Sequence, residues 1–323
     1  MPPVGNVLRR PPGVGRHAPS GGDPGLNREV LAILGPTASG KTTTAIEIAL
    51  RIGGEIVSAD SMQVYRGMNV GTAKPTVIER RGVPHHLIDI VEPEEEFTVA
   101  QYRRMGREVM ESSEVPLIIV GGSGLHFRAL VDPMSFAPTD PELRSDLEKE
   151  ELEELVERLA ALDPDAGWHV DLANKRRVVR ALEIAGITGE TPSQRAQSAE
   201  AEDLRRYVSD IEFTAVGVDP GGVIDERIDR RLEEMRRGGL VEEVQGLRGR
   251  MGRTARSAVG YREILEHLEG RTSLDEAFEA IRENTRKLAK KQRSWFQRDP
   301  RIRWIPWMDD EAERVERAME ILT

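Results

Sequence analysis

The stretch Gly35-Pro36-Thr37-Ala38-Ser39-Gly40-Lys41-Thr42 decides the fold class of this chain. It matches the pattern G-x-x-x-x-G-K-[ST] at every fixed position. The apolar run 30–34 precedes it, and a helix-like segment, 42–51, follows it. In such a strand–loop–helix unit, backbone N–H groups of the loop and of the helix N-terminus converge on phosphate oxygens. The sequence therefore predicts a site for a di- or triphosphate, with Lys41 on the outer phosphate and the Thr42 hydroxyl on Mg²⁺.

The segments that follow the loop alternate between strand and helix patterns. A helical pattern covers 98–112, and the apolar run before Gly121-Gly122-Ser123-Gly124 is typical of a buried parallel strand. Further strands are predicted at 55–58, 87–90, 115–120 and 213–218. The fold class is therefore predicted to be α/β, a P-loop NTPase-like parallel sheet flanked by helices.

The pattern changes after Pro138, where leucines recur at helical spacing from Leu143 to Leu162. These leucines predict one long helix that begins at Asp140-Pro141, and a second helix is predicted at about 171–185. The remainder after the strand at 213–218 is predicted to be helical. The predicted domains are a disordered tail, a first part of the core, a helical insertion, and a part that completes the core and ends in helices, at 1–27, 28–137, 138–204 and 205–323.

Composition narrows the function classes. The chain has 323 residues and no cysteine, which excludes disulfides, thiolate zinc sites and a cysteine nucleophile. Its apolar runs are too short to predict a membrane span. We expect the protein to be cytoplasmic and monomeric. The net charge is −10, yet eight Lys or Arg and only one acid lie between Arg286 and Arg303. Such segregation leaves room for a nucleic-acid partner, because binding depends on where cations cluster.

Several side chains are candidates for chemistry, each with a plainer alternative. Asp60 follows the second strand and is a base or metal ligand, or else the cap of a turn. Ser123 brings a hydroxyl to the ligand, or belongs to a tight strand-to-helix turn. Arg227 and Arg231 lie one helical turn apart. They are interpreted either as a clamp for a diphosphate or as part of a solvated basic face. His126 and the pair His85-His86 lack a metal-ligand pattern and are interpreted as loop or packing residues.

Two basic clusters accompany the phosphate site. The first decorates the second insertion helix, and the second flanks an apolar stripe near Trp295 and Phe296. Cations beside aromatic groups suit phosphate contact and base stacking, although a solvated helix face is the alternative for each cluster. The cluster residues are Arg176, Arg177 and Arg180, and Lys287, Lys290, Lys291 and Arg293.

Seven motifs in order, spread over about 30–307, closely resemble the tRNA dimethylallyltransferase (isopentenyl-tRNA transferase) family. They are 35–42, 58–68, 70–75, 84–90, 121–125, 258–263 and 285–296. The resemblance implies transfer of a dimethylallyl group from dimethylallyl diphosphate, with Mg²⁺. The acceptor is the exocyclic N6 amine of the adenosine directly 3′ of the anticodon (position 37), in tRNAs that read codons beginning with U. Diphosphate is released.

The resemblance also implies residue roles. The loop 35–42, a nucleotide- or ATP-binding loop by family label, holds the diphosphate, and Asp60 is the general base. Ser123 stands where the family usually has Thr and keeps the hydroxyl, whereas His126 replaces a common Tyr. Arg227 and Arg231 match diphosphate-side arginines. The implied partner is the anticodon stem-loop of tRNA. The residues implied to contact it are Asp60, Ser61, Met62, Gln63, Ser123, Arg144, Arg176, Arg177, Val178, Val179, Arg180, Ser257, Ala258, Val259, Gly260, Tyr261, Arg262, Lys290 and Lys291.

Three other functions share parts of this pattern. A nucleoside or shikimate-type kinase has the same loop and sheet, and a regulatory P-loop protein binds nucleotide without chemistry. A relative of the family alkylates free adenine nucleotides. The basic segments 176–180 and 286–303 count against the kinases and the last option, which do not need them. The chain also lacks an apolar run that ends in Asp-Glu, the usual magnesium carboxylate of motor ATPases.

Overall fold

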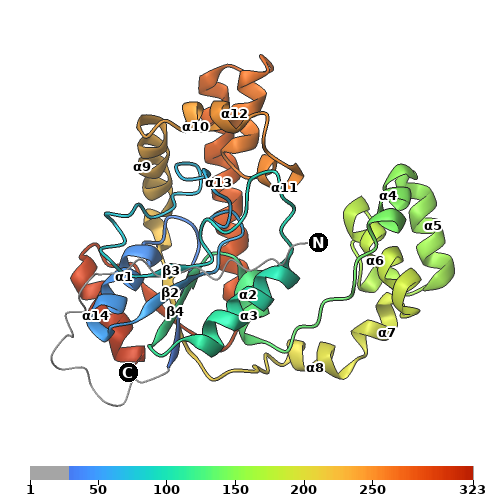
Figure 1. Cartoon of the computed structure of the whole chain (residues 1–323), viewed down its shortest axis with the longest axis horizontal. Coiled ribbons are helices and arrows are strands. Elements are labelled where there is room, and N and C mark those ends of the chain that lie inside the picture. The colour runs from blue at the N-terminus through green and yellow to red at the C-terminus, as the bar shows by residue number, and fades with distance from the viewer. Residues whose placement is uncertain (1–28, 323) are drawn as a thin grey trace, which may run out of the picture.

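A computed structural model describes residues 29–322, and the predicted disordered tail, 1–27, lies outside this range. A six-stranded sheet with the order β3-β2-β4-β1-β5-β6 forms the centre of the molecule, and all of its strand pairs are parallel (Figure 1). The predicted α/β class is thereby confirmed. The strands are β1 Val30–Leu34, β2 Glu55–Ser58, β3 His85–His86, β4 Leu117–Gly121, β5 Thr214–Asp219 and β6 Ile302–Pro306.

Helices cover both faces of the sheet, which explains why its strands are apolar without alternation. On one face Leu31 and Ile33 pack with the helices α1 (Lys41–Ile52) and α14 (Glu311–Leu322). On the other, Ala32 and Leu34 pack in a cluster that includes residues of α2 (Val99–Ser112) and α3 (Gly124–Val131). This two-sided burial holds the loop after β1 at the centre of the sheet edge.

Two strand predictions were wrong. The third strand is His85–His86, not 87–90, because Leu87 and Asp89 have φ values of 61° and 55°, which break an extended backbone. The remainder after β5 is not wholly helical, since β6 pairs with β5 at the sheet edge. Both strands lie at the edges of the sheet, where a short or half-exposed strand carries a weak apolar signal.

The insertion between α3 and β5 consists of helices that lie apart from the sheet (Figure 1). The single long helix predicted from Asp140 is in fact two, because the helix breaks at Glu150 and Glu151. Leu147, Leu155 and other residues of these helices form a separate small core, whereas Leu162 remains 49% exposed. The elements are α4 Pro141–Lys149, α5 Leu152–Leu162, η1 Ala166–Trp168, α6 Lys175–Thr188, α7 Pro192–Ala196 and α8 Ala199–Arg205.

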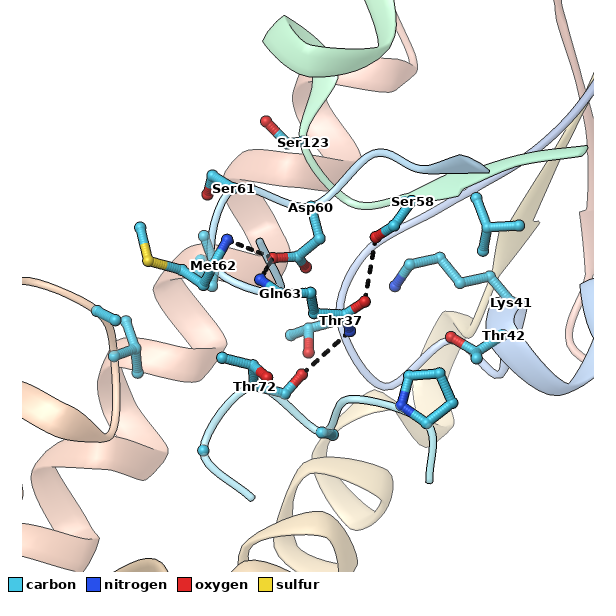
Figure 2. A pocket seen from close by; sticks show the side chains of 18 of the residues that line it. Thr37, Lys41, Thr42, Ser58, Asp60, Ser61, Met62, Gln63, Thr72 and Ser123 are labelled. Atoms are coloured by element: carbon cyan, nitrogen blue, oxygen red, sulfur yellow. Dashed lines mark hydrogen bonds between the residues drawn. The ribbon is translucent and has the colours of Figure 1, made fainter. Parts of the chain in front are cut away.

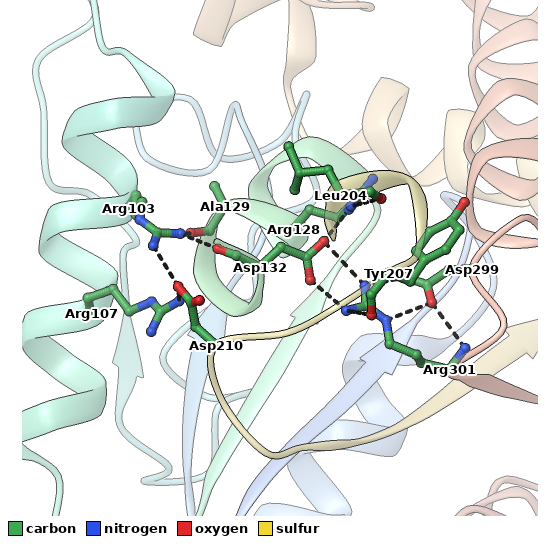
Figure 3. A network of polar contacts seen from close by, with 10 residues as sticks. All are labelled: Arg103, Arg107, Arg128, Ala129, Asp132, Leu204, Tyr207, Asp210, Asp299 and Arg301. Atoms are coloured by element: carbon green, nitrogen blue, oxygen red, sulfur yellow. Dashed lines mark hydrogen bonds and ion pairs between the residues drawn. The ribbon is translucent and has the colours of Figure 1, made fainter. Parts of the chain in front are cut away.

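A network of ion pairs holds the chain where it returns from the insertion (Figure 3). Arg301 pairs with Asp299 at 2.7 Å and with the fully buried Asp132 at the end of α3. Arg128 pairs with the same Asp132 and donates to the carbonyl of Leu204 at 2.6 Å. These contacts fix the base of the insertion to α3 and to the turn that leads into β6.

The C-terminal helices build a further core over the carboxyl edge of the sheet. Buried residues of α9, α10, α12 and α13 pack there with Tyr65 and Met68 from the long segment after β2. The helices are η2 Gly221–Val223, α9 Ile224–Arg237, α10 Leu240–Leu247, α11 Arg253–Arg256, α12 Tyr261–Leu268 and α13 Leu274–Phe296. Within residues 29–322, no helix combines the length and apolar character needed to cross a membrane.

Candidate active site

A cavity of about 170 Å³ lies at the carboxyl ends of β1, β2 and β4 (Figure 2). In open parallel sheets this edge is where ligands bind. Thr37, Lys41 and Thr42 reach it from the phosphate loop, and Asp60 and Ser123 reach it from the loops after β2 and β4. The structure thus brings together most of the side chains that the sequence marked for chemistry.

The phosphate loop has the backbone of an anion site. Gly40 caps α1 with φ 81°, and Ala38 also has a left-handed φ of 61°. Lys41 is half-buried and its Nζ donates to the carbonyl of Pro36 at 3.1 Å. Burial, with the Arg231 charge nearby, lowers the pKa of Lys41 to about 8. A cation so poorly compensated favours an anionic ligand.

The Thr42 hydroxyl is the group that the phosphate-loop pattern assigns to Mg²⁺. It lines the cavity and makes no hydrogen bond to any residue in the described range. No group of three or more His, Cys, Asp or Glu in residues 29–322 is arranged to hold an ion. This donor set fits a Mg²⁺ ion that takes most of its ligands from substrate phosphates and water.

Asp60 closes a turn with one carboxylate oxygen and leaves the other without a hydrogen bond in the described residues. Its Oδ1 accepts hydrogen bonds from the backbone N–H of Met62 at 2.8 Å and of Gln63 at 3.2 Å, which closes a tight turn. Its Oδ2 makes no hydrogen bond within residues 29–322. The carboxylate lies close enough to Lys41 and Arg231 for its charge to raise the pKa of each, against the lowering by burial. One oxygen is therefore structural and the other is free for chemistry (Figure 2).

Ser123 is held by His126, which sequence reasoning treated as a packing residue. The Ser123 hydroxyl and the His126 Nδ1 lie 2.8 Å apart. The His126 ring packs edge-on against Tyr102, whose hydroxyl donates to the carbonyl of Ser58 at 2.9 Å. Burial lowers the pKa of His126 to about 4, so the ring is neutral at pH 7. The imidazole thus orients Ser123 without adding charge to the site.

Arg227 and Arg231 make different contacts in the structure. Arg231 lines the cavity beside Lys41 and donates only to the Thr72 carbonyl at 3.3 Å. It forms no ion pair within the described part of the chain, and burial lowers its pKa. Arg227 instead donates from Nε to the carbonyl of Ala38 and lies over the ring of Trp307. Arg231 is therefore the arginine that faces the cavity.

Sequence reasoning missed Gln292, a residue of α13 that joins two parts of the site. Its Oε1 accepts from the backbone N–H of Thr37 at 2.8 Å, and its side chain packs on Gly122. A Cβ on Gly122 would lie 2.6 Å from Gln292 Nε2. Gln292 therefore fixes the phosphate loop against the turn that carries Ser123.

Glu243 of α10, also missed, holds the loop that forms the opposite wall. Its carboxylate accepts from the backbone N–H of Asn69, Val70 and Gly71 at 2.8–3.1 Å. The hydroxyl of Tyr261 donates to it as well, at 2.5 Å. No local motif marks this carboxylate, because the three backbone N–H groups that it binds lie more than 170 positions away in sequence.

The other residues implied by family resemblance lie in different environments. Ser61, Met62, Gln63, Ala258 and Val259 line the cavity. Gly260 and Tyr261 are buried, whereas Ser257 and Arg262 are exposed. Lys290 and Lys291 are exposed on α13 and form no ion pair within the described residues. Trp295 and Phe296, considered for stacking, pack edge-on against each other, and Phe296 is fully buried in the core.

A larger cleft of about 1360 Å³ lies along the insertion. Arg176 and Arg177 line it and are exposed, but Arg144 and Arg180 are held by the buried Glu183. Val178 and Val179 pack in the core of the insertion, with exposures of 0% and 2%. Leu125 and Trp168 also line the cleft, and Trp168 is 86% exposed. Its lining includes seven arginines and three glutamates, at Arg144, Arg176, Arg177, Arg180, Arg195, Arg205 and Arg253 and at Glu148, Glu190 and Glu200.

Comparisons with known proteins agree on one family. The family model "IPP transferase" matches residues 63–299. A tRNA dimethylallyltransferase of Bifidobacterium longum is 42% identical over 310 residues, which cover 92% of each chain. A protein of the same name from Parafrankia sp. is 46% identical over 299 residues, which cover 89% of this chain and 91% of the relative.

Solved structures give the same result. The tRNA isopentenylpyrophosphate transferase of Bacillus halodurans superimposes with a TM-score of 0.66 at 34% identity, and covers 91% of this chain and 94% of its own. A eukaryotic dimethylallyltransferase acting on tRNA has the same fold, with a TM-score of 0.73 at 24% identity. The fold of the sheet, with its helical C-terminal part, is thus that of this group of enzymes.

Proposed function

Because this chain belongs to the IPP transferase family, we infer that it is a tRNA dimethylallyltransferase. It transfers a dimethylallyl group from dimethylallyl diphosphate to N6 of the adenosine directly 3′ of the anticodon (position 37), in tRNAs that read codons beginning with U. Diphosphate is the other product. The observation that carries this proposal is one small cavity lined by a phosphate loop, by Arg231 and by Asp60, which has a free carboxylate oxygen.

The diphosphate end of the reaction takes place at the phosphate loop. The bond between the allylic carbon and the diphosphate oxygen breaks as negative charge builds on the departing diphosphate. Loop N–H groups, Lys41 and Arg231 stabilise that charge at the cavity. The Thr42 hydroxyl would hold Mg²⁺, which supplies further positive charge to the leaving group.

The adenosine end lies at the loops after β2 and β4. The exocyclic amine is a poor nucleophile, and it forms the new N–C bond while it loses a proton. Asp60 accepts that proton on Oδ2, since its Oδ1 is already occupied by the Met62 and Gln63 amides. Ser123, oriented by His126, lies on the same wall and contacts the amine or the ring of the base.

The tRNA reaches the cavity through the basic surfaces around it. The target adenosine must leave its stack to enter the cavity. Arg176 and Arg177 in the insertion cleft, with Lys290 and Lys291 on α13, offer exposed cations to the phosphates of the anticodon stem-loop. The proposal includes a monomer as the active form. tRNA as substrate places the enzyme in the cytoplasm.

Ligand preference tests this function against a small-molecule kinase, which shares the phosphate loop. We expect calorimetry with Mg²⁺ to show tighter binding of dimethylallyl diphosphate than of ATP, because the chain lacks the apolar run ending in Asp-Glu that usually supplies the magnesium carboxylate of motor ATPases. Labelled dimethylallyl diphosphate should also transfer its label to unmodified tRNA. ATP-dependent phosphorylation of a nucleoside, without any transfer to tRNA, would contradict the proposal.

A further inference from the structure

A stack of two arginines on one tryptophan lies behind the phosphate loop. The guanidinium carbon of Arg227 is 3.7 Å from the ring centroid of Trp307, and that of Arg314 is 4.4 Å from the same ring. Arg227 belongs to α9, whereas Trp307 and Arg314 come from the last segment of the chain. Cations at these distances are attracted to the face of an indole ring.

The stack contacts the phosphate loop at Ala38, a residue with a left-handed backbone conformation. Arg227 donates from Nε to the carbonyl of Ala38, whose φ of 61° is one that a residue with a Cβ seldom adopts. On the next turn of the loop, a Cβ on Gly40 would lie 3.0 Å from the Trp307 ring. The tryptophan ring therefore abuts the loop, and the arginine holds Ala38 by its carbonyl.

Arg314 fixes the other side of the stack. It is only 3% exposed, and it donates to the Thr44 hydroxyl of α1 at 3.0 Å and to the carbonyl of Met308 at 2.7 Å. The Trp307 indole N–H donates to Asp309 at 2.7 Å. The ring therefore lies between Arg227 and the anchored Arg314, and its N–H is bonded to Asp309.

The residues of the stack come partly from outside the matched family model, which ends at residue 299. We propose that Arg227 and Trp307 are positioning residues, which hold the phosphate loop in its diphosphate-binding conformation before the ligand arrives. This inference rests on the proposed function of the loop. A loop that is competent only part of the time binds its ligand more weakly in proportion to that fraction. Loss of the stack should therefore weaken diphosphate binding and leave tRNA binding and the chemical step unchanged.

The test measures the dissociation constant of inorganic diphosphate with Mg²⁺ by calorimetry. We expect Trp307→Leu to raise it about three- to thirtyfold, the range of one cation–π contact. Trp307→Phe, which keeps an aromatic face, should restore most of the affinity. Arg317→Ala is the matched control, because Arg317 is an exposed arginine of α14, the helix that carries Arg314, and pairs with Glu320.

Arg227→Gln serves as a second variant, since it leaves the packing of Trp307 on Arg314 in place. If both residues act through one loop conformation, the double variant should be no weaker than the weaker single variant. In the full reaction, KM for dimethylallyl diphosphate should rise while kcat and KM for tRNA stay within about twofold.

Two results would overturn the proposal. One is an unchanged diphosphate affinity in both single variants, which would leave the stack a purely structural contact. The other is a large loss in Arg227→Gln that adds to that of Trp307→Leu, which would mean that Arg227 touches the ligand directly. Failure of the proposed function is a separate result, in which wild type binds diphosphate but never modifies tRNA.

Discussion

At the scale of single residues, Asp60 shows why sequence could not choose between a cap and a base. The pattern Ser-Ala-Asp-Ser is ordinary turn chemistry, and Asp60 does close a turn through Oδ1. Only the structure shows that Oδ2 is left free and that Lys41 and Arg231 lie near it. The same limit applies to His126, whose contact with Ser123 no metal-ligand pattern could predict.

Asp60→Asn separates the two roles. The amide oxygen of Asn keeps an acceptor for the Met62 and Gln63 amides, so folding and tRNA affinity should be nearly unchanged. The transfer rate should fall by about 10²–10⁴, because no carboxylate remains to take the proton of the amine. Single-turnover kinetics measure the rate, and thermal melting is the control. Near-normal turnover would remove Asp60 from the role of base.

His126 should make the stability of the fold depend on pH. Burial holds its pKa at about 4, below the ordinary 6.5. Between these values the unfolded chain binds a proton that the folded protein does not, so stability falls as the pH falls from 6.5 toward 4. The free energy of unfolding should therefore be about 2 kcal/mol lower at pH 5 than at pH 8.

Urea unfolding at pH 5 and pH 8 measures this dependence. His126→Gln should flatten the change between the two pH values, relative to wild type. His169→Gln, at an exposed histidine of the insertion, is the matched control and should keep the wild-type pH dependence. An equal pH dependence in wild type and His126→Gln would show that this histidine is not the group responsible.

At the scale of elements, the residues of α13 fall into three groups that make different contacts. Phe278, Ile281 and Ala289 pack inward, Gln292 bonds the phosphate loop, and Lys290 and Lys291 face solvent. Periodicity predicted the apolar stripe and the exposed lysines, because both repeat at helical spacing. It could not predict Gln292, since a single polar residue on a helix carries no signal of a partner 255 positions away.

Lys290→Ala combined with Lys291→Ala tests the exposed face. Both lysines are free of ion pairs within the described residues, so they can contact phosphates without first losing a partner. The double variant should raise the tRNA dissociation constant and reduce the slope of log affinity against log salt by roughly one unit for each lost contact. Affinity for dimethylallyl diphosphate should barely change.

A salt series of tRNA binding supplies the measurement. Arg51→Ala, on α1 and already paired with Glu316, is the control that should leave the slope as it is. An unchanged slope in the lysine double variant would mean that these lysines form only a solvated helix face, and that the tRNA follows another path.

The strand β6 was missed because it lies at the edge of the sheet. β1, β2, β4 and β5 were predicted because both of their faces are buried, which leaves a continuous apolar run. In β6 the side chains of Arg303 and Pro306 are exposed at the edge of the sheet, which weakens that pattern. The break between α4 and α5 was hidden for another reason, because leucine spacing continues across Glu150 and Glu151.

At the scale of the whole molecule, the cleft beside the insertion collects cations in a protein with a net charge of −10. Arg176, Arg195 and Arg253 reach it from three different helices, α6, α7 and α11. Sequence indicated the cluster on α6 but not the arginines of α7 and α11 that line the same cleft, because that depends on how the insertion lies against the rest of the chain. The cleft therefore supports tRNA binding more strongly than any cluster alone.

Trp168 should take part in tRNA binding if this cleft carries the anticodon arm. Its ring is 86% exposed among the arginines of the cleft, and stacking of a base on an aromatic ring contributes about 1–3 kcal/mol. Trp168→Ala should therefore weaken tRNA binding by about five- to a hundredfold. Trp168→Phe should retain most of the affinity.

Leu162→Ala is the matched control, because Leu162 is an exposed apolar residue of the insertion that does not line the cleft. Fluorescence anisotropy with labelled tRNA measures all of these variants, and calorimetry checks that dimethylallyl diphosphate still binds. Equal tRNA affinity in wild type and Trp168→Ala would place the nucleic acid away from this wall of the cleft.

The central claim is that one cavity joins dimethylallyl diphosphate to an adenosine of tRNA. The most direct test is to incubate the protein with dimethylallyl diphosphate, Mg²⁺ and an unmodified tRNA transcript, and then to map the product by mass spectrometry. We predict one dimethylallyl group on N6 of the adenosine 3′ of the anticodon, with one diphosphate released for each group transferred. Transfer to free adenine nucleotides in preference to tRNA, or no transfer at all, would contradict this account.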